Sequence, residues 1–545
     1  MTQMRFNLSF NPKKQKKTTE ADIQNITSPE TMDKKQVAIV GAGVSGLLAC
    51  KYCLSKGFKP IVFDTEPDIG GVWTKTIKTT RLQTPKALYQ FSDFPWPTSV
   101  TDDFPTHQQI LDYIRAYATQ FDLIPHIRFC SRVKGISYDG PSSDTWSLWN
   151  GTGEPFTECK WNVTVENTQT ATTQVYTVDF VILCLGRFKD VPNIPEFPAG
   201  KGPEVFKGQV IHSMEYAAMD DNAAAEFVKG KKVVVVGFGK TGLDIARECS
   251  SINGLEQPTS IVYRRDHWKL PDWAPWGIPL PLLYLNRFSH LLVHKPGEGF
   301  LLSVLATLLS PLRWGVSKFV ESHIKRKVPL AKFNMVPQHS LSKDARSCMI
   351  SYMPNPNDFF DEVEKGSINL KKSKTFSFYD TGILLEDANT TIEAEVVIFA
   401  TGFKGVKKLE DIFESSTFGQ SIASSPRVPL YRECIHPRIP QLAIIGFSES
   451  FSNLYISEMR SKWLAALLEG AFKLPSINEM QKDIMKWDEY MKQSAGEYHC
   501  RSAIGALEIW YNDQLCKDMG MDPMRKNGLL ANLFEPYGPM DYTRK

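Results

Sequence analysis

Two glycine-rich turns constrain the fold of this 545-residue chain more than any other feature. The first consists of Gly41, Gly43 and Gly46, between an apolar run at 37–40 and a helix-forming stretch at 47–54. In a strand–turn–helix unit of this kind, the first glycine makes the tight turn and the second lets the backbone approach a pyrophosphate. The third glycine lets helix and strand pack closely, and the helix N-terminus holds the phosphates. The spacing therefore predicts a Rossmann-like dinucleotide-binding unit.

An acidic residue follows the next predicted strand, at 60–63. A carboxylate at Asp64 accepts hydrogen bonds from ribose hydroxyls and repels a 2′-phosphate. The first turn therefore fits FAD or NAD better than NADP. The alternative is a glycine-rich turn in an unrelated α/β protein.

The second turn has the same spacing but a different charge at the end of the following strand. Its glycines follow the strand predicted at 231–236, and the predicted helix begins at Thr241. The strand at 260–263 ends in Arg264 and Arg265, and arginine binds phosphate through two parallel hydrogen bonds. We therefore predict an NADPH site here, although Asp266 weakens the argument and a solvated strand end is the alternative. The glycines of this turn are Gly237, Gly239 and Gly242.

Two other predicted strands, at 179–186 and 395–402, also end in glycine and suit crossings between nucleotide-binding domains. The predicted fold class is α/β, with an NADPH-binding domain inserted into a discontinuous FAD-binding domain. We predict a disordered polar tail at 1–34, the first part of the FAD-binding domain at 35–205 and the NADPH-binding domain at 206–395. The second part of the FAD-binding domain and a C-terminal helical region take 396–545.

Composition excludes several classes of protein. A net charge of +3 gives no general argument for binding nucleic acid. The ten cysteines lack metal-ligand spacing, so we predict no metal site, and we interpret Cys50 and Cys53 as buried helix residues. An apolar leader is absent from the N-terminal sequence, which predicts a cytoplasmic protein with reduced cysteines.

The segment 276–320 is unusually apolar. Its runs at 278–285 and 300–309 are too short to span a bilayer, and basic residues lie among and after them. One interpretation is a buried helix pair that shields the substrate site. The alternative is a peripheral contact with a membrane, such as that of the endoplasmic reticulum.

Between the two turns lies a pattern of four residues that resembles the fingerprint FxGxxxHxxx(Y/F) of the class B flavin-containing monooxygenases. The resemblance covers roughly 36–475, and further landmarks lie at 70–73, 399–402 and 458–463. Within the family, the chain looks most like the plant pathogen-response clade, which is associated with N-hydroxylation of pipecolic acid in plant defence. The residues that carry the resemblance are Phe206, Gly208, His212 and Tyr216, with Gly71, Trp73, Thr401 and Gly402 as cofactor-binding candidates.

The resemblance implies an FAD- and NADPH-dependent oxygenase that forms a C4a-hydroperoxyflavin from O₂. A nitrogen or sulfur nucleophile then takes the distal oxygen, so the expected substrate is an amine, an amino acid or a thioether. Gln83 occupies the place of an asparagine that helps to hold the oxygenated flavin in many members. It is therefore our candidate for a catalytic contact, with ordinary loop packing as the alternative. His212 is expected to link the two domains.

Three other functions compete. A Baeyer–Villiger oxygenase resembles this pattern, but its fingerprint usually ends in tryptophan where this chain has Tyr216. A pyridine nucleotide–disulfide reductase needs a redox cysteine pair near the flavin. A non-catalytic flavin-binding regulator would also retain both turns.

Overall fold

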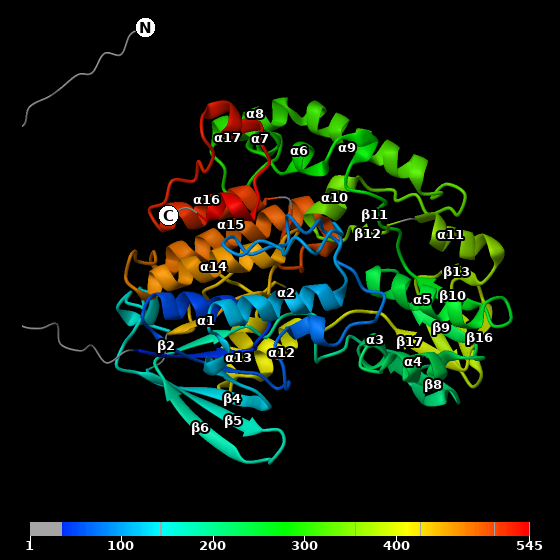
Figure 1. Ribbon diagram of the computed structural model, residues 1–545, viewed down its shortest axis with the longest axis horizontal. Coiled ribbons are helices and arrows are strands. Elements are labelled where there is room, and N and C mark those ends of the chain that lie inside the picture. The colour runs from blue at the N-terminus through cyan, green and yellow to red at the C-terminus, as the bar shows by residue number, and fades with distance from the viewer. Residues whose placement is uncertain (1–34, 142–143, 355, 426, 506, 544–545) are drawn as a thin grey trace, which may run out of the picture. The chain divides into compact units, whose positions relative to one another are not determined.

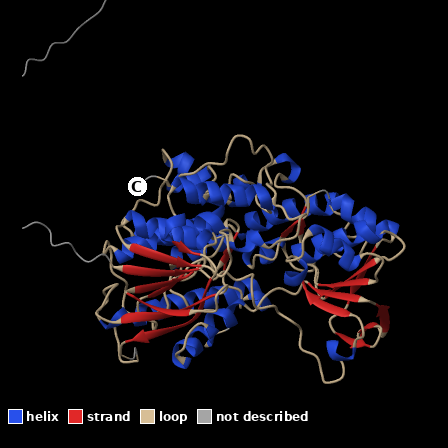
Figure 2. Ribbon diagram, turned by 60° about the horizontal axis from the view of Figure 1, so that its bottom comes forward, coloured by secondary structure: helices blue, strands red, loops and turns tan. Residues whose placement is uncertain are grey.

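Two five-stranded parallel sheets form the framework of the chain (Figure 1). The computed structural model describes residues 35–141, 144–354, 356–425, 427–505 and 507–543, so the predicted tail at 1–34 lies outside the described residues. Figure 2 shows the two sheets as separate groups of strands. This arrangement confirms the predicted fold class.

The first sheet contains the strand that precedes the first glycine turn. Val40 pairs with Phe63 on one side and with Leu183 on the other, so three strands end together beside Gly41. The strands next to the glycine turn are buried on both faces, as expected of a parallel sheet covered by helices. The order is β18-β7-β1-β2-β3, with β1 (Gln36–Val40), β2 (Lys59–Phe63), β3 (Ile127–Arg128), β7 (Phe180–Leu183) and β18 (Leu442–Ile444).

The second sheet repeats this plan around the second glycine turn. Val236 pairs with Val262 and with Phe399, which again brings three strand ends together at a glycine, Gly237. The order is β13-β10-β9-β17-β8, with β8 (Gln209–His212), β9 (Val233–Val236), β10 (Thr259–Tyr263), β13 (Ile368–Lys372) and β17 (Val396–Phe399).

The strand β17 corrects one predicted domain boundary. We placed the return to the FAD-binding domain at 396, but 396–399 pairs with β9 and β8 in the second sheet. The chain rejoins the first sheet only at β18, which pairs with β7. The error arose because a buried strand that ends in glycine looks the same in either sheet.

Helices and smaller sheets complete the structure. Three-stranded antiparallel sheets contain β4 (Ser131–Asp139), β5 (Lys160–Asn167) and β6 (Thr173–Val178), and β14 (Phe376–Tyr379), β15 (Gly382–Leu385) and β16 (Thr390–Glu393). Two-stranded pairs contain β11 (Lys269–Leu270) with β12 (Ser351–Tyr352), and β19 (Glu449–Ser450) with β20 (Ala503–Gly505). The helices are α1 (Val44–Ser55), α2 (His107–Gln120), α3 (Ser213–Tyr216), α4 (Asp221–Val228), α5 (Lys240–Asn253), α6 (Leu280–Tyr284), α7 (Arg287–Leu291), α8 (Phe300–Leu308), α9 (Ser310–Lys327), α10 (Leu341–Arg346), α11 (Pro356–Lys365), α12 (Gly405–Asp411), α13 (Ser416–Ala423), α14 (Asn453–Leu468), α15 (Ile477–Ala495), α16 (Glu508–Asp518) and α17 (Leu529–Phe534).

A buried carboxylate ties the C-terminal part of the chain to the first sheet. Helix α14 packs on α1, and Glu458 of α14 accepts a hydrogen bond of 2.7 Å from the Tyr52 hydroxyl of α1. The same carboxylate accepts hydrogen bonds from the backbone amide and hydroxyl of Ser92. Burial alone would raise the pKa of Glu458, but Lys462 and these donors lower it below its ordinary value. The ionised carboxylate therefore joins three segments that are remote in sequence.

The apolar segment 276–320 folds into α6, α7, α8 and the start of α9. Ala306 is the only buried residue of α8, while Phe300 and Leu301 are 80% and 81% exposed, so α8 is not part of a buried helix pair. Among the described residues, no single helix is long and apolar enough to cross a membrane. The α8–α9 pair, bent by 49°, meets the length and hydropathy criteria only when the two helices are taken together.

Candidate active site

A single cavity of about 2160 Å³ contains both glycine turns. This volume exceeds that of an ordinary small-ligand pocket, as two dinucleotides would require. Most of the predicted site residues line it, whereas Gly46, Gly242 and the four fingerprint residues do not. Those that line it are Gly41, Gly43, Asp64, Gly71, Trp73, Gln83, Gly237, Gly239, Thr241, Arg264, Arg265, Thr401 and Gly402.

The first glycine of each turn is required by the protein backbone itself. Gly41 and Gly237 have φ values of +108° and +124°, which strongly disfavour a side chain. A Cβ atom would also lie 2.5 Å from the Cys184 carbonyl oxygen at Gly41, and 2.3 Å from the Ala400 carbonyl oxygen at Gly237. The two turns therefore share the same steric design.

The third glycines are required for packing in the same way. A Cβ atom at Gly46 would lie 1.8 Å from the carbonyl oxygen of Gly41, and one at Gly242 would lie 2.3 Å from that of Gly237. Each helix can therefore approach its strand only because this residue has no side chain.

The second glycines have no comparable requirement within the chain. Among the described residues, a Cβ atom at Gly43 would meet only Gly71, at an ordinary contact distance of 3.4 Å, and one at Gly239 would meet nothing within 4 Å. Both glycines face the cavity at the N-terminus of a helix, α1 or α5. Open space at this position is what a pyrophosphate needs to reach the backbone amides. The turns therefore fit the dinucleotides that the sequence predicts.

Asp64 lies on the cavity wall and is already held by the backbone. Its Oδ2 accepts a hydrogen bond of 2.6 Å from the Ala42 amide, and its Oδ1 accepts one of 2.9 Å from the Glu66 amide. A carboxylate has about four acceptor positions. The bonds fix the orientation of the side chain and leave acceptor capacity for the predicted ribose contact.

The two arginines that follow β10 have different surroundings. Arg265 donates to the Tyr498 hydroxyl at 3.2 Å and forms an ion pair of 2.6 Å with Glu497. Arg264 is exposed on the cavity wall and has no hydrogen bond or ion pair with the described residues. Arg264 is therefore the arginine that is free to meet a 2′-phosphate.

Asp266, which weakened the NADPH prediction, is engaged elsewhere. Its Oδ2 forms a short ion pair with Lys372 at the end of β13, and its side chain is only 10% exposed. Asp266 is also not among the residues that line the cavity. Its charge is therefore balanced by the neighbouring strand.

The fingerprint residues act in the framework of the second domain. His212 Nε2 donates to the Gly402 carbonyl at 2.9 Å, while its Nδ1 accepts from the Met214 amide at 3.2 Å. Burial lowers the pKa of His212, which favours the neutral ring that both bonds need. His212 therefore joins β8 to the turn after β17 within the second domain, and the expected link between the two domains stays a prediction.

The other three fingerprint residues are packing positions. Phe206 lies 5.6 Å from the ring of Phe378, and a Cβ atom at Gly208 would lie 2.4 Å from the Glu395 carbonyl oxygen. The Tyr216 hydroxyl donates to Glu248 of α5 at 3.3 Å. Phe206 and Gly208 thus pack the chain around β8 against Phe378 and Glu395, and Tyr216 holds α3 against the helix that follows the second glycine turn.

Gln83 connects the two halves of the cavity. Its side-chain oxygen accepts a hydrogen bond of 3.3 Å from the Tyr352 amide, and its backbone oxygen accepts one of 3.0 Å from the Trp273 indole. Both partners lie in the segment between β10 and β13. These contacts place Gln83 at the junction of the halves, and its predicted contact with flavin or NADP⁺ stays a prediction.

The remaining candidates lie on both sides of this junction. The Trp73 indole donates to the Tyr89 hydroxyl at 3.0 Å, so the ring is held at the first turn. The Thr401 hydroxyl donates to the Asn193 carbonyl, and the Gly402 carbonyl accepts from the Asn193 amide at 2.9 Å. Thr241 lies in the first turn of α5 and faces the cavity.

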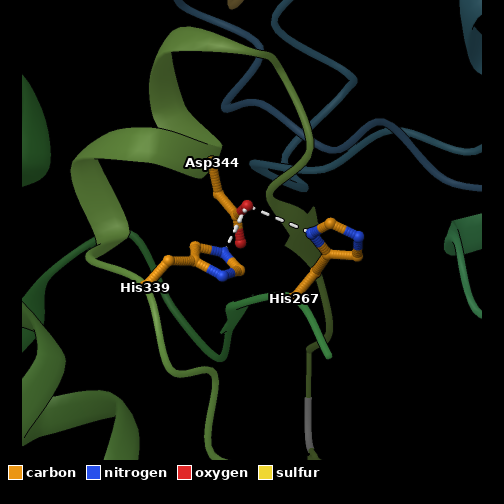
Figure 3. A group of neighbouring side chains, drawn as sticks. All are labelled: His267, His339 and Asp344. Carbon is orange, nitrogen blue, oxygen red and sulfur yellow. Dashed lines mark hydrogen bonds and ion pairs between the residues drawn. The ribbon is translucent and has the colours of Figure 1, made fainter. Parts of the chain in front are cut away.

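A cluster of two histidines and an aspartate, missed in the sequence, anchors the loop after Arg265 (Figure 3). Figure 3 shows both imidazoles directed at Asp344, whose Oδ1 lies 3.1 Å from His267 Nδ1 and 2.7 Å from His339 Nε2. Asp344 Oδ2 accepts a hydrogen bond of 2.8 Å from the Trp268 amide. Burial alone would raise the pKa of Asp344, but hydrogen bonds from the two histidines lower it to about 2.

These side chains are also of the types that bind metals, and their three ligand atoms lie within 4.8 Å of one another. Each already has a hydrogen-bonding partner, and the ammonium group of Lys269 is buried nearby. Burial lowers the pKa of Lys269 to about 8, and Asp344 partly offsets this effect. We therefore interpret the cluster as a hydrogen-bonded anchor. The three residues lie 72 and 5 positions apart in the sequence, which gave no ligand-spacing signal.

The CxxC pair behaves as a structural feature. Cys50 and Cys53 are buried in α1, and all ten cysteines are free. Burial raises the pKa of the Cys50 thiol to about 12 and raises that of Cys53 further. Both thiols are therefore protonated and unreactive at neutral pH.

The chain belongs to the flavin-binding monooxygenase-like family, whose model matches residues 34–532. It is similar to the probable flavin-containing monooxygenase 1 of Arabidopsis thaliana, with 40% identity over 94% of this chain and 97% of the relative. The family and the two-turn cavity together define an FAD- and NADPH-dependent monooxygenase.

Solved structures support the fold at lower identity. S-allyl-L-cysteine S-oxygenase of Allium sativum is 18% identical, with a TM-score of 0.57 over 90% of this chain and 89% of that chain. A steroid monooxygenase solved with NADP is 17% identical, with a TM-score of 0.62 over 89% of this chain and 98% of that chain. At these identities, the likeness shows the fold alone.

Proposed function

We propose that this monooxygenase oxygenates a nitrogen or sulfur nucleophile on a small molecule. The observation that carries the proposal is that one cavity holds both dinucleotide turns and is also lined by charged residues outside them, among them Arg187, Glu449 and Arg501. Tyr216 at the end of the fingerprint favours this class over Baeyer–Villiger oxygenation, as the family resemblance implies. Among such substrates we favour an amino acid with a secondary amine, with pipecolic acid as the first candidate and a thioether as the second.

The protein supplies binding, orientation and protection from water. Bound FAD and NADPH together supply the reducing electrons and the activation of O₂. The N-termini of α1 and α5 orient the two dinucleotides through their amide groups and dipoles. Leu280, Tyr284 and Leu285 of the apolar segment line the cavity and exclude water from it.

Aerobic turnover with NADPH against four matched compounds tests the proposal. The compounds are pipecolic acid, piperidine, S-allyl-cysteine and cyclohexanone, and the product is identified by the mass gain of one oxygen atom. We expect an oxygenated amine or thioether, with NADPH consumed in proportion to product. Lactone formation from the ketone, without reaction of the other three compounds, would assign the enzyme to the Baeyer–Villiger class instead.

We further propose that α8 and α17 hold the enzyme at the cytoplasmic face of a membrane. Helix α17 packs on α7, and α7 packs on α8, so two apolar segments remote in sequence lie together (Figure 1). In α17, Leu529 and Leu530 are 78% and 72% exposed, comparable to Phe300 and Leu301 in α8. Exposed apolar surface of this kind favours a partner, and a lipid surface accepts it without a matching shape.

Charge favours a bilayer over a second copy of the chain. Glu298 is the only acidic residue in 276–320, and it accepts a hydrogen bond from the Lys295 amide. Helix α9 ends in three exposed basic residues, Lys325, Arg326 and Lys327, which suit anionic headgroups.

Flotation with anionic vesicles tests this contact. The wild type is expected to float, while F300E/L301E stays in the soluble fraction and L255E, an exposed leucine elsewhere, behaves as the wild type. Flotation of F300E/L301E at the wild-type level would refute the contact. A dimer that dissociates in this variant, without flotation of the wild type, would identify a second copy as the partner.

A further inference from the structure

Two arginines and a glutamate that belong to neither glycine turn form a charged cluster on the cavity wall. Arg187 Nη1 lies 3.3 Å from Glu449 Oε1, and Arg501 Nη2 donates a short hydrogen bond to Glu449 Oε2. All three residues line the cavity. Their side chains are 15%, 9% and 27% exposed in this order, so the cluster is largely removed from bulk water.

The fold assembles this cluster from three remote segments. Arg187 follows Gly186 at the exit of β7, and Glu449 begins β19. The pairing of β19 with β20 brings the Glu449 amide to the Ser502 carbonyl at 2.7 Å, and this contact places Arg501 beside the glutamate. The guanidinium of Arg187 also lies 5.3 Å from the ring of Phe447, which limits its orientation.

The cluster has one more positive charge than its own carboxylate can balance. Arg187 and Arg501 carry two positive charges against the single negative charge of Glu449. Among the described residues, buried Arg501 Nε has no hydrogen-bond partner, while Arg187 Nη1 and Glu449 Oε1 face only each other, as an ion pair without hydrogen-bond geometry. Burial lowers the pKa of Arg187, and nearby Glu449 offsets this only in part. Buried polar atoms are usually hydrogen-bonded, so an orphaned guanidinium donor beside an unbalanced positive charge on a cavity wall indicates an anionic partner.

The anionic groups of the cofactors have other candidate positions. The pyrophosphates fit the open second glycines at Gly43 and Gly239, and the 2′-phosphate fits Arg264. The partner of the cluster is therefore a further anion with access to the same cavity. A monooxygenase admits one other organic molecule there, its substrate.

We propose that Arg187 and Arg501, held by Glu449, bind a carboxylate on the substrate. The inference rests on the proposed function and narrows it, because it assigns an amino acid, which carries a carboxylate, in place of an amine that lacks one. The two guanidiniums meet the carboxylate and leave the nucleophilic nitrogen or sulfur free to face the flavin.

The proposal can be tested with arginine variants and a matched pair of compounds. Pipecolic acid and piperidine share the amine and differ by the carboxylate. We expect R501Q and R187Q each to raise the Kd and KM for pipecolic acid about 10- to 100-fold, as for loss of a charge-assisted hydrogen bond. The same variants leave the values for piperidine unchanged. R501K should recover part of the loss because it keeps the charge, and R128Q is the control at an exposed arginine outside the cavity.

Two measurements do not depend on turnover. Calorimetric titration of the FAD-loaded protein with NADP⁺ present measures binding of each compound directly. On the wild type, cyclohexanecarboxylate, which has the carboxylate without the amine, should compete with pipecolic acid. Absence of this competition would overturn the proposal even if both arginine variants fail to fold.

The outcomes separate this inference from the proposed function. If neither an amine nor a thioether is oxygenated by the wild type, the proposed function fails. If these compounds react but R501Q and R187Q affect pipecolic acid and piperidine equally, only the carboxylate subsite fails. If R501Q and R187Q lose FAD, or if they raise the KM for NADPH without affecting pipecolic acid, the cluster binds a cofactor. Either result would also overturn the carboxylate subsite.

Discussion

Two alanine substitutions in the second turn, three residues apart, should have opposite consequences. At Gly239, the backbone has φ −78° and ψ −180°, which any residue adopts, and the new Cβ meets no atom within 4 Å. Reduced freedom of the unfolded chain stabilises G239A by about 0.4–1 kcal/mol. The less favourable alanine at the N-cap of α5 costs about as much. We therefore expect the stability of G239A to stay within about 1 kcal/mol of the wild type.

Binding of NADPH to G239A should nevertheless fall. The added methyl group occupies the space through which the pyrophosphate reaches the α5 amides. Loss of charge-assisted hydrogen bonds there, at about 1.5–3 kcal/mol, weakens binding about 10- to 150-fold. G242A is the matched comparison, because its Cβ would lie 2.3 Å from the Gly237 carbonyl oxygen and 3.4 Å from the Ala400 Cβ. We expect overpacking to destabilise G242A by about 1–3 kcal/mol or more.

The assay combines urea unfolding with anaerobic reduction of the bound flavin. Unfolding midpoints report stability, and the dependence of flavin bleaching on NADPH concentration gives the Kd. Wild-type affinity in a stable, FAD-loaded G239A would refute a pyrophosphate at this turn. Wild-type stability in G242A would refute the close helix–strand contact.

Three further changes test other parts of the structure. G46A should lose FAD because its Cβ would lie 1.8 Å from the Gly41 carbonyl oxygen, and a normal ratio of flavin to protein absorbance would contradict this. R264A should lose about 10- to 100-fold in kcat/KM with NADPH and little in kcat/KM with NADH. R265A, whose side chain is held by Glu497, should change the ratio of kcat/KM with NADPH to kcat/KM with NADH less than R264A does. Equal effects of the two variants on this ratio would refute the assignment of the 2′-phosphate to Arg264. E508Q should become more stable relative to the wild type as pH rises from 4.5 to 7, by about 3 kcal/mol, because burial raises the pKa of Glu508 from 4.5 to about 7. Below pH 4.5 the carboxyl is protonated in both the folded and unfolded states, so the stability difference between E508Q and the wild type stays constant there. If that difference also stays constant between pH 4.5 and 7, Glu508 is ionised in the fold and the reasoning is refuted.

Local sequence was sufficient to predict the cofactor turns. Each one is a strand, three glycines and a helix within a short stretch, and the steric need for Gly41 and Gly237 arises from an adjacent strand end. The same local reasoning failed at 396–399, where the pattern showed a buried strand but not which sheet it joins. Strand pairing is a long-range property, and here it also depends on β8, nearly 190 residues earlier in the chain.

Charges near the site were harder to assign from sequence. Arg264 and Arg265 look equivalent in the chain, but Glu497 engages only Arg265 in the fold. In the sequence Asp266 argues against NADPH, but in the fold its charge is paired with Lys372 on another strand. In each case the deciding partner lies more than 100 residues away, and no spacing rule identifies it.

The two kinds of binding surface in this cavity therefore differ in how they are encoded. Each cofactor turn carries its three glycines and its helix end in one continuous stretch of sequence. The charged wall depends on β7, β19 and the segment before β20 meeting in space, and the apolar segment 276–320 covers another side. Under the proposed subsite, substitutions at 187, 449 and 501 alter which substrate is held and leave the glycines of both dinucleotide turns unchanged.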